Sequence, residues 1–214
     1  MKSLNLGFFM KKRYFIILVL LAAIISTSAQ ATLVKPLNLQ NLVGIATYVV
    51  KATVTDKVIE EDVYESGAIV NYYTLEIKEW VKGTPPSGME KEIIIKQLAS
   101  GEFTQGSKTI RQNVGFPEYE IGKTYVFFLP KPHAVSGLLA PIGLMQGVFE
   151  VQTDKQGKET IPALTKRAKL LSKGLVVKKN QAFLSKQLNA AASGSDNTYS
   201  SFKSMINSVK GEAE

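Results

Sequence analysis

The sequence predicts a mainly β domain, an antiparallel barrel or sandwich of five or six strands over about residues 45–161, followed by one or two helices. Two observations carry this prediction. Short runs of β-branched and aromatic residues alternate with clusters of Gly and Pro, and no long helical pattern separates them. After Pro162 the apolar spacing changes to that of a helix.

Six segments have the composition of strands. Residues 68–81 alternate between apolar and polar side chains, and 125–129 is a strongly apolar run ended by Pro130 and Pro132. Gly147 stands in the fifth segment, where we expect a bulge or a bend. The predicted strands are residues 47–56, 68–81, 92–98, 125–129, 143–151 and 159–161.

Two connections between these segments are distinctive. Residues 60–67 are rich in acidic side chains but lack the regular ligand spacing of a calcium loop, so we interpret them as a solvated turn. Residues 99–119 contain three Gly, one Pro and few aliphatic side chains, which indicates a long loop.

Helical spacing appears before and after the predicted strands. Residues 37–46 predict a short helical lead-in, and a helix over 163–175 has one apolar stripe, with Pro162 in its first turn. The stripe consists of Leu164, Ala168, Leu171 and Leu175, and Lys166, Lys169 and Lys173 form a basic face opposite it. Residues 187–199 resemble a small-polar linker. A second stripe follows, which we expect Ser200 or Ser201 to cap; it consists of Phe202, Met205, Ile206 and Val209.

Residues 1–31 have the pattern of an export signal. A cationic start at residues 11–13 precedes twelve almost wholly apolar residues, and Ala29-Gln30-Ala31 is a small-x-small cleavage triplet. Twelve residues are too few to cross a bilayer, which needs about 20. We therefore predict a mature chain that begins at Thr32, is periplasmic or extracellular, and keeps no transmembrane anchor.

Two further expectations follow from this pattern. The signal is compact when read from Met10, so we expect translation to start there, which terminal sequencing of the precursor tests. The predicted division is 1–31 signal peptide, 32–162 β-barrel domain and 163–214 helical and polar extension.

Composition excludes several kinds of chemistry. The chain has no cysteine, so it has no disulfide, thiolate metal site or Fe–S cluster. Its one histidine, His133, stands in a Pro-rich loop and lacks the partners of a zinc site, so we predict no metal and no cofactor. The net charge falls from +8 to +4 on removal of residues 1–31, which hold four basic residues and no acid. This weakens the case for a nucleic-acid partner.

Four segments in this order resemble a family of uncharacterised exported bacterial β-rich proteins. They are residues 49–56, residues 72–83 ending in Trp80-Val-Lys-Gly83, Gly122-x-x-Tyr125-x-x-Phe128-Leu129, and Gln146-Gly147-x-Phe149-x-Val151. The likeness covers about residues 40–152 and supplies no catalytic residues. The same pattern is remotely similar to netrin-like domains and tissue inhibitors of metalloproteinases, which implies an OB-like barrel. Those inhibitors depend on an N-terminal Cys and on disulfides that this chain lacks.

The leading functional prediction is a non-enzymatic binding or interaction module whose partner is an envelope protein or a polyanionic surface. OB-type barrels commonly bind through one face and its loops. Export argues against nucleic acid as the ligand. The alternative is a cell-envelope hydrolase that uses paired carboxylates; the candidate carboxylates are Glu76, Glu79, Glu118 and Glu120.

The predicted binding surface is the loop 99–119, because loops on a rigid scaffold carry most recognition sites. Its candidate residues are Arg111, Gln112, Asn113, Phe116 and Phe103. The two aromatic residues either present themselves to a partner or, as we expect, anchor the loop. The basic face of Lys166, Lys169 and Lys173 is a second candidate surface, for anionic partners.

Overall fold

The structure is a computed structural model, and it describes residues 35–64, 67–176 and 180–210. The predicted signal peptide, its cleavage point and the start at Met10 lie outside these residues. The elements are α2 (Leu39–Ile45), β1 (Tyr48–Glu61), β2 (Ile69–Lys82), β3 (Glu92–Leu98), β4 (Gly101–Gln105), β5 (Lys108–Gln112), β6 (Thr124–Leu129), η1 (Leu144–Gly147), β7 (Val148–Thr153), β8 (Glu159–Thr160), α3 (Pro162–Ser172), α4 (Gln181–Ala192) and α5 (Tyr199–Lys210). None of the described helices is long and apolar enough to cross a membrane.

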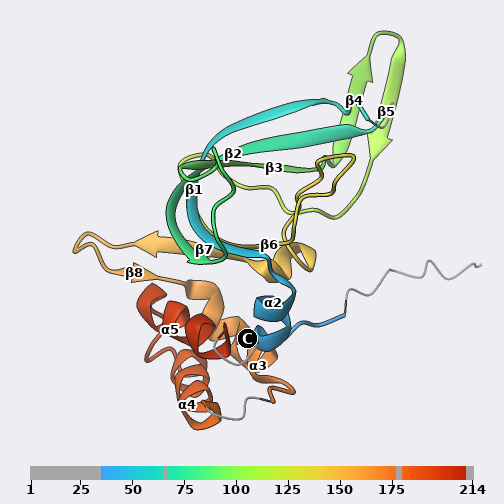
Figure 1. The fold of residues 1–214 in the computed structure, drawn as a ribbon. Coiled ribbons are helices and arrows are strands. Elements are labelled where there is room, and N and C mark those ends of the chain that lie inside the picture. The colour runs from blue at the N-terminus through green and yellow to red at the C-terminus, as the bar shows by residue number, and fades with distance from the viewer. Residues whose placement is uncertain (1–34, 65–66, 177–179, 211–214) are drawn as a thin grey trace, which may run out of the picture. The chain divides into compact units, whose positions relative to one another are not determined.

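Six strands form one antiparallel sheet in the order β3-β2-β1-β6-β7-β8, and β4 and β5 form a separate hairpin (Figure 1). The predicted mainly β, antiparallel architecture is confirmed. In the described part of the chain the outer strands β3 and β8 do not pair with each other, and no closed barrel is found. The OB-like detail therefore stays a prediction.

Strands β1 and β2 are both 14 residues long and strongly curved (Figure 1). Their register shifts at three places along β1, between Val49 and Val50, between Lys51 and Ala52, and between Val54 and Asp56. Such irregularities bend a strand and increase its twist. The bends let β1 and β2 contribute residues to both of the molecule's hydrophobic cores.

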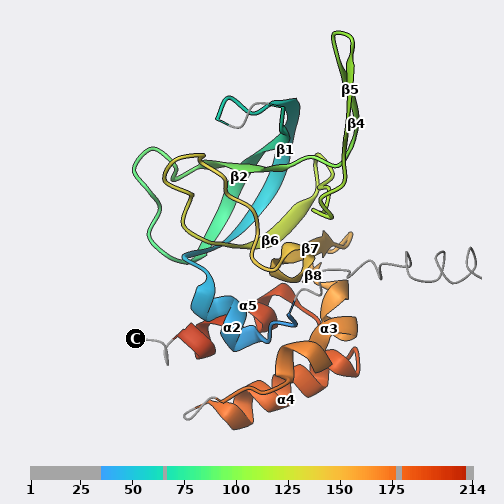
Figure 2. The same ribbon diagram turned by 90° about the vertical axis from the view of Figure 1, so that its right-hand side faces the viewer.

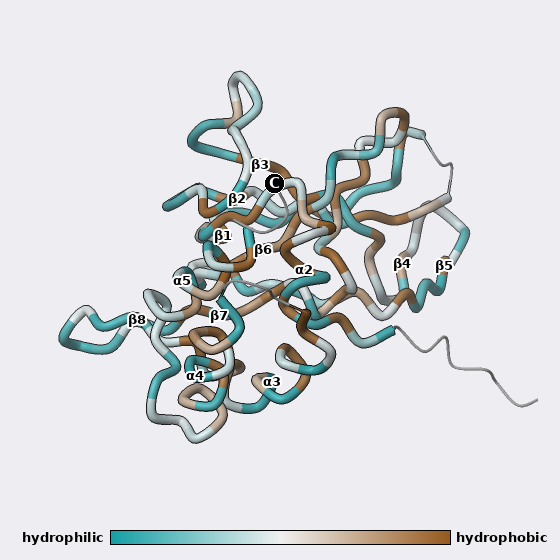
Figure 3. Tube along the Cα trace, turned by 60° about the horizontal axis from the view of Figure 1, so that its bottom comes forward, coloured by the Kyte–Doolittle hydropathy of each residue, from teal (hydrophilic) through white to brown (hydrophobic). Residues whose placement is uncertain are grey.

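Strand β6 explains why a five-residue run can be wholly apolar. Tyr125, Phe127 and Leu129 belong to an inner core with residues of β1, β2 and β3, while Val126 and Phe128 belong to an outer core with the helices. A strand that is buried on both faces needs apolar residues at successive positions. In Figure 3 the strands at the centre of the molecule are brown, whereas the turn before β8 is teal.

The helices gather on one side of the sheet, and the hairpin β4–β5 projects at the opposite end (Figures 1 and 2). The second predicted stripe is confirmed, since Phe202, Met205, Ile206 and Val209 of α5 are buried. The first is confirmed for Leu164, Ala168 and Leu171 of α3, whereas Leu175 lies beyond the end of the helix and is half-buried against the same core. These residues share the outer core with Val126, Phe128 and Phe149 of the sheet.

Three predictions in the C-terminal region were wrong. The described residues after β8 form three helices, α3, α4 and α5, and not one or two. Residues 187–192 are not linker but the second half of α4, whose stripe of Leu184, Leu188 and Ala191 is diluted by small and polar residues. The cap of α5 is not Ser200 or Ser201. The helix begins at Tyr199, and the hydroxyl of the preceding residue, Thr198, accepts a hydrogen bond from the Ser201 backbone N–H at 3.3 Å.

The predicted loop 99–119 and the predicted fifth strand also differ from the structure. The loop contains the hairpin β4–β5, whose strands are mostly polar because the hairpin projects into solvent. Residues 144–147 form the 3-10 turn η1, and the strand begins only at Val148. A Cβ at Gly147 would lie 2.5 Å from the Ile142 carbonyl oxygen, so this glycine permits a tight turn.

The acidic segment 60–67 is not a solvated turn throughout. Strand β1 continues to Glu61, and Asp62 is buried. Its carboxylate accepts a hydrogen bond from the buried Lys96 ammonium at 2.8 Å, and Lys96 also donates to the Ser136 carbonyl at 2.7 Å. A buried carboxylate is tolerated here because it is paired.

Candidate functional site

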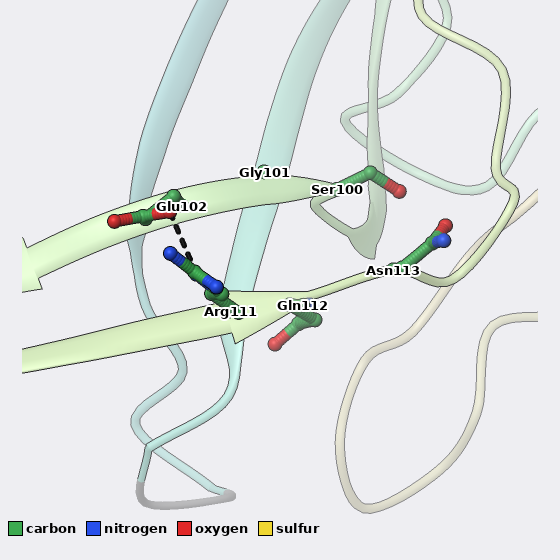
Figure 4. Close-up of a pocket in the computed structure, with 6 residues that line it drawn as sticks. All are labelled: Ser100, Gly101, Glu102, Arg111, Gln112 and Asn113. Atoms are coloured by element: carbon green, nitrogen blue, oxygen red, sulfur yellow. Dashed lines mark hydrogen bonds and ion pairs between the residues drawn. The ribbon is translucent and has the colours of Figure 1, made fainter.

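The predicted residues Arg111, Gln112 and Asn113 line a pocket of about 450 Å³ at the base of the hairpin, shown in Figure 4. The other lining residues are Ser100, Gly101 and Glu102. The Arg111 side chain is 81% exposed and pairs with Glu102 at 2.8 Å. An ion pair this exposed contributes little to stability.

Gln112 holds the hairpin rather than facing a ligand. Its amide nitrogen donates to the carbonyls of Ile69 at 2.8 Å and Ala99 at 2.7 Å, and its oxygen accepts from the Ile69 N–H at 3.2 Å. Three backbone hydrogen bonds use most of the capacity of one amide group. Asn113 is exposed beside it.

Phe103 and Phe116, the aromatic candidates of the predicted loop, are both half-buried. The Phe103 ring lies over Gly101, where an added Cβ would be 3.2 Å from the ring. Phe103 also lines a hollow with Ile59, near the end of β1, and Ile69, at the start of β2. Phe116 directly precedes residues 117–120, which line a second pocket.

A second pocket, of about 420 Å³, lies where β6, β7, η1 and α3 meet, and we call it the tyrosine pocket. It is lined by Pro117, Glu118, Tyr119, Glu120, Tyr125, Met145, Gln146, Val148, Glu150, Ala163 and Arg167. Strand pairing brings Tyr125 opposite Glu150. The segment 117–120 is fixed because the buried Gln97 amide donates to the Pro117 carbonyl at 2.6 Å.

The two tyrosines form the rigid inner wall of this pocket. Tyr119 packs edge to face on Tyr125 and Phe127, with ring centroids 5.7 and 5.2 Å apart. The Tyr119 hydroxyl donates to the Gln97 side-chain oxygen, and the Tyr125 hydroxyl accepts from the Glu120 N–H. Burial raises the pKa of both tyrosines, so both hydroxyls are protonated at neutral pH.

Arg167 forms the wall on the helix side. Its guanidinium lies 4.0 Å from the centre of the Phe149 ring and donates to the carbonyls of Val148, at 2.9 Å, and Gln146. Burial lowers the pKa of Arg167 to about 10. The guanidinium therefore remains charged at neutral pH while two of its N–H groups donate to backbone carbonyls.

Carboxylates form the rim. Glu118 pairs with Lys57 at 3.2 Å, and Lys123 is shared between Glu120 at 2.7 Å and Glu150 at 3.5 Å. The hydrogen bond to Glu120 raises the pKa of Lys123. Two of the four carboxylates considered for a hydrolase, Glu118 and Glu120, thus meet at one pocket.

The other two, Glu76 and Glu79, lie on β2 and do not line this pocket. Glu76 pairs with Lys78, and Glu79 pairs with Lys203 and accepts from the Tyr199 hydroxyl at 2.7 Å. Burial alone would raise the pKa of Glu79, but these hydrogen bonds outweigh it and hold the pKa below the ordinary 4.5.

The lysines of the predicted basic face and the single histidine all lie at the surface. Lys166, Lys169 and Lys173 are exposed, and none forms an ion pair with another described residue. His133 is exposed and contacts Ser136 within its own loop. The described residues contain no group of three acidic or histidine side chains that could hold a metal ion.

Sequence reasoning did not find Tyr125, Glu150 or Arg167 as site residues. One signal was present: the other basic residues of α3 are lysines, and Arg167 is its only Arg. Arg is favoured where a guanidinium meets several acceptors or an aromatic face. No family model matches this chain, and neither does any curated protein. The family resemblance and the similarity to netrin-like domains therefore stay predictions.

Proposed function

We propose that this protein is an exported, non-enzymatic binding module that holds a small ligand, with an apolar body and a cationic end, in the tyrosine pocket. The observation that carries the proposal is a pocket with aromatic and aliphatic walls, a carboxylate rim, and side chains fixed by packing and hydrogen bonds. Small-molecule sites usually combine an apolar surface with a few fixed polar groups.

The charge of the lining favours a cation over an anion. Three carboxylates line the pocket, those of Glu118, Glu120 and Glu150, and Arg167 is the one cation among the lining residues. Lys57 and Lys123 pair with these carboxylates from outside the lining and offset part of their charge, so the excess of negative charge at the pocket is modest. Two of the five N–H groups of Arg167 already donate to backbone carbonyls, which leaves fewer donors for an anion. An ammonium group can instead join the carboxylates, and Glu150 lies opposite Tyr125 of the aromatic wall in the strand pairing.

The pairing of the carboxylates supports binding rather than hydrolysis. A glycosidase needs one carboxylic acid whose pKa is raised so that it can donate a proton. All four candidate carboxylates form an ion pair with a lysine, and the pKa of Glu79 is lowered. Turnover of a cell-wall glycan or peptide that is abolished by substituting one carboxylate would overturn the non-enzymatic reading.

Two finer features belong to this proposal. We propose that the curved sheet is an open variant of an OB-like barrel, since β1 and β2 bend around an inner core. Superposition on solved OB folds tests this. We also propose export, because residues 1–31 have the pattern of a cleaved signal. Sequencing the N-terminus of the mature protein tests this, and a mature protein that still begins at Met1 or Met10 would contradict it.

Three probes with one ring and different charges test the pocket by calorimetry at pH 7: 2-phenylethylamine (cation), 2-phenylethanol (neutral) and 3-phenylpropionate (anion). We expect the amine to bind at least about 5-fold more tightly than the alcohol, a difference of about 1 kcal/mol. Glu150→Gln should remove this preference, and Glu76→Gln, a change of an exposed carboxylate on β2, should not. Equal affinity for amine and anion would contradict the proposal.

A further inference from the structure

The helical region has a large excess of positive charge. Between Pro162 and Lys210 the sequence contains nine Lys and Arg and one acid, Asp196. Asp196 is engaged locally, since its carboxylate accepts from the hydroxyls of Thr198 and Ser201 at the start of α5. The exposed cations of this region therefore have few acidic neighbours along the chain.

Four of these cations lie on the helical hairpin α3–α4. Lys166 and Lys169 lie in α3, Lys173 directly follows its last residue, and Lys186 lies in the second turn of α4. All four side chains are exposed, and none forms an ion pair with another described residue. Figure 2 shows α3 and α4 side by side, at the end away from the hairpin β4–β5.

Two large apolar side chains are exposed at the same end of this helix pair. Val176, just after α3, is 69% exposed, and Phe183, in the first turn of α4, is 39% exposed. The position of Val176 is fixed, because its N–H and carbonyl each form a 3.0 Å hydrogen bond with the Gln40 amide. The Asn38 amide holds the Lys173 carbonyl at 3.0 Å in the same way.

We propose that the exposed side chains along this end of α3 and α4 together bind the surface of an anionic phospholipid bilayer; they are Lys169, Lys173, Val176, Phe183 and Lys186. The lysines complement the phosphate headgroups, and Val176 and Phe183 enter the boundary with the acyl chains. Interfacial binding combines charge attraction with burial of apolar side chains, and each basic residue near the surface adds to it. The apolar pair favours a bilayer over a soluble polyanion, which offers no apolar phase.

Co-sedimentation with vesicles tests the proposal, which is independent of the tyrosine pocket. The probes are vesicles of phosphatidylglycerol with phosphatidylcholine, and vesicles of phosphatidylcholine alone. We expect binding to the anionic vesicles, weakened at least about 10-fold by Lys169→Glu with Lys173→Glu. The matched control, Lys91→Glu with Lys131→Glu, makes the same change of net charge at exposed lysines outside the helices.

A second variant separates a bilayer from other polyanions. Val176→Ser with Phe183→Ser should weaken vesicle binding several-fold, most clearly at high salt where charge attraction is screened. All variants carry the same N-terminal residues, so any contribution of residues 1–34 to vesicle binding cancels between them. Thermal unfolding confirms that each variant is folded. Equal weakening by the two lysine pairs, or unchanged binding of the serine variant, would overturn the proposal.

Discussion

Arg167 is bound to the sheet through one guanidinium group. It donates to two carbonyls at the junction of η1 and β7 and lies over the buried Phe149 ring. Both carbonyls would lack these partners if the side chain were removed. Unpaired polar groups that are largely withdrawn from water are costly, so this residue has a structural role in addition to lining the pocket.

We expect Arg167→Ala to lower the free energy of unfolding by about 2–4 kcal/mol, from two lost hydrogen bonds and a lost cation–π contact. Lys166→Ala, at the exposed neighbouring position, should change it by no more than about 0.5 kcal/mol. Urea unfolding measures both. An equal effect of the two substitutions would show that Arg167 does not hold the η1–β7 junction.

Some single-residue features were beyond sequence reasoning for a physical reason. Asp62 and Lys96 are 34 positions apart, and their pairing depends on how β1, β2 and β3 align. In the sequence Asp62 is one of several acids in a hydrophilic run, which is typical of a turn. Only the register of the sheet brings it beside Lys96.

The hairpin β4–β5 is an element whose position depends on few contacts. Its strands have five residues each, and a two-stranded ribbon is at best marginally stable without support. Gln112 supplies that support through its three hydrogen bonds to Ile69 and Ala99. The hairpin should therefore open locally once these bonds are lost.

We expect Gln112→Ala to increase amide hydrogen exchange in residues 101–112 by about 10-fold or more, equivalent to a local loss of roughly 1–3 kcal/mol. The midpoint of global unfolding should change much less, because the hairpin contributes no residue to either core. Asn113→Ala is the control, since Asn113 is exposed next to it. Unchanged exchange in the hairpin would rule out this role of Gln112.

At the level of elements, the sequence predicted those with strong periodicity. Strand β3 matches its predicted bounds, and β6 and α3 differ by one to a few residues. Helix α4 was missed altogether, because Ala and Ser weaken its apolar stripe. Hairpin β4–β5 was missed because polar strands that face solvent lack the alternation of apolar residues that marks a half-buried strand.

The sheet and the C-terminal helices are joined by a polar network as well as by the outer core. Glu79 of β2 contacts Tyr199 and Lys203 of α5, while Lys51 of β1 pairs with Glu159 at 2.6 Å and lies over the Tyr199 ring. In the folded state the pKa of Glu79 is lowered, and so are those of Asp62 and Asp196. A lowered pKa means that the folded state binds the proton more weakly than the unfolded state does.

The pH dependence of stability follows from these three pKa shifts. Their contribution is fully present above the ordinary values of about 4 and is lost as the pH falls through the lowered ones, so the free energy of unfolding should decrease from pH 5 to pH 2. Glu79→Gln should make this decrease shallower by at most about 1 kcal/mol, because the pair is partly exposed. Urea unfolding across this range measures it, and a slope as steep as that of the unchanged protein would exclude Glu79 as a contributor.

For the whole molecule, the antiparallel β architecture was predictable, but its closure was not. Turn signals and strand spacing indicate the strands of the main sheet, whereas closure depends on whether the outer strands are long enough to meet. The last strand, β8, has two residues and pairs with β7 alone among the described strands. The tyrosine pocket was unpredictable for a similar reason, since its residues come from five separate segments.

The most direct test of the central claim is a map of amide chemical shifts during titration with 2-phenylethylamine. The account predicts saturable shifts for Tyr119, Tyr125 and Val148, and for Ala163 at the start of α3, with no comparable change at Ser100 or Asn113 in the hairpin pocket. Shifts confined to the hairpin pocket, or none that saturate, would contradict the assignment of the tyrosine pocket as the binding site.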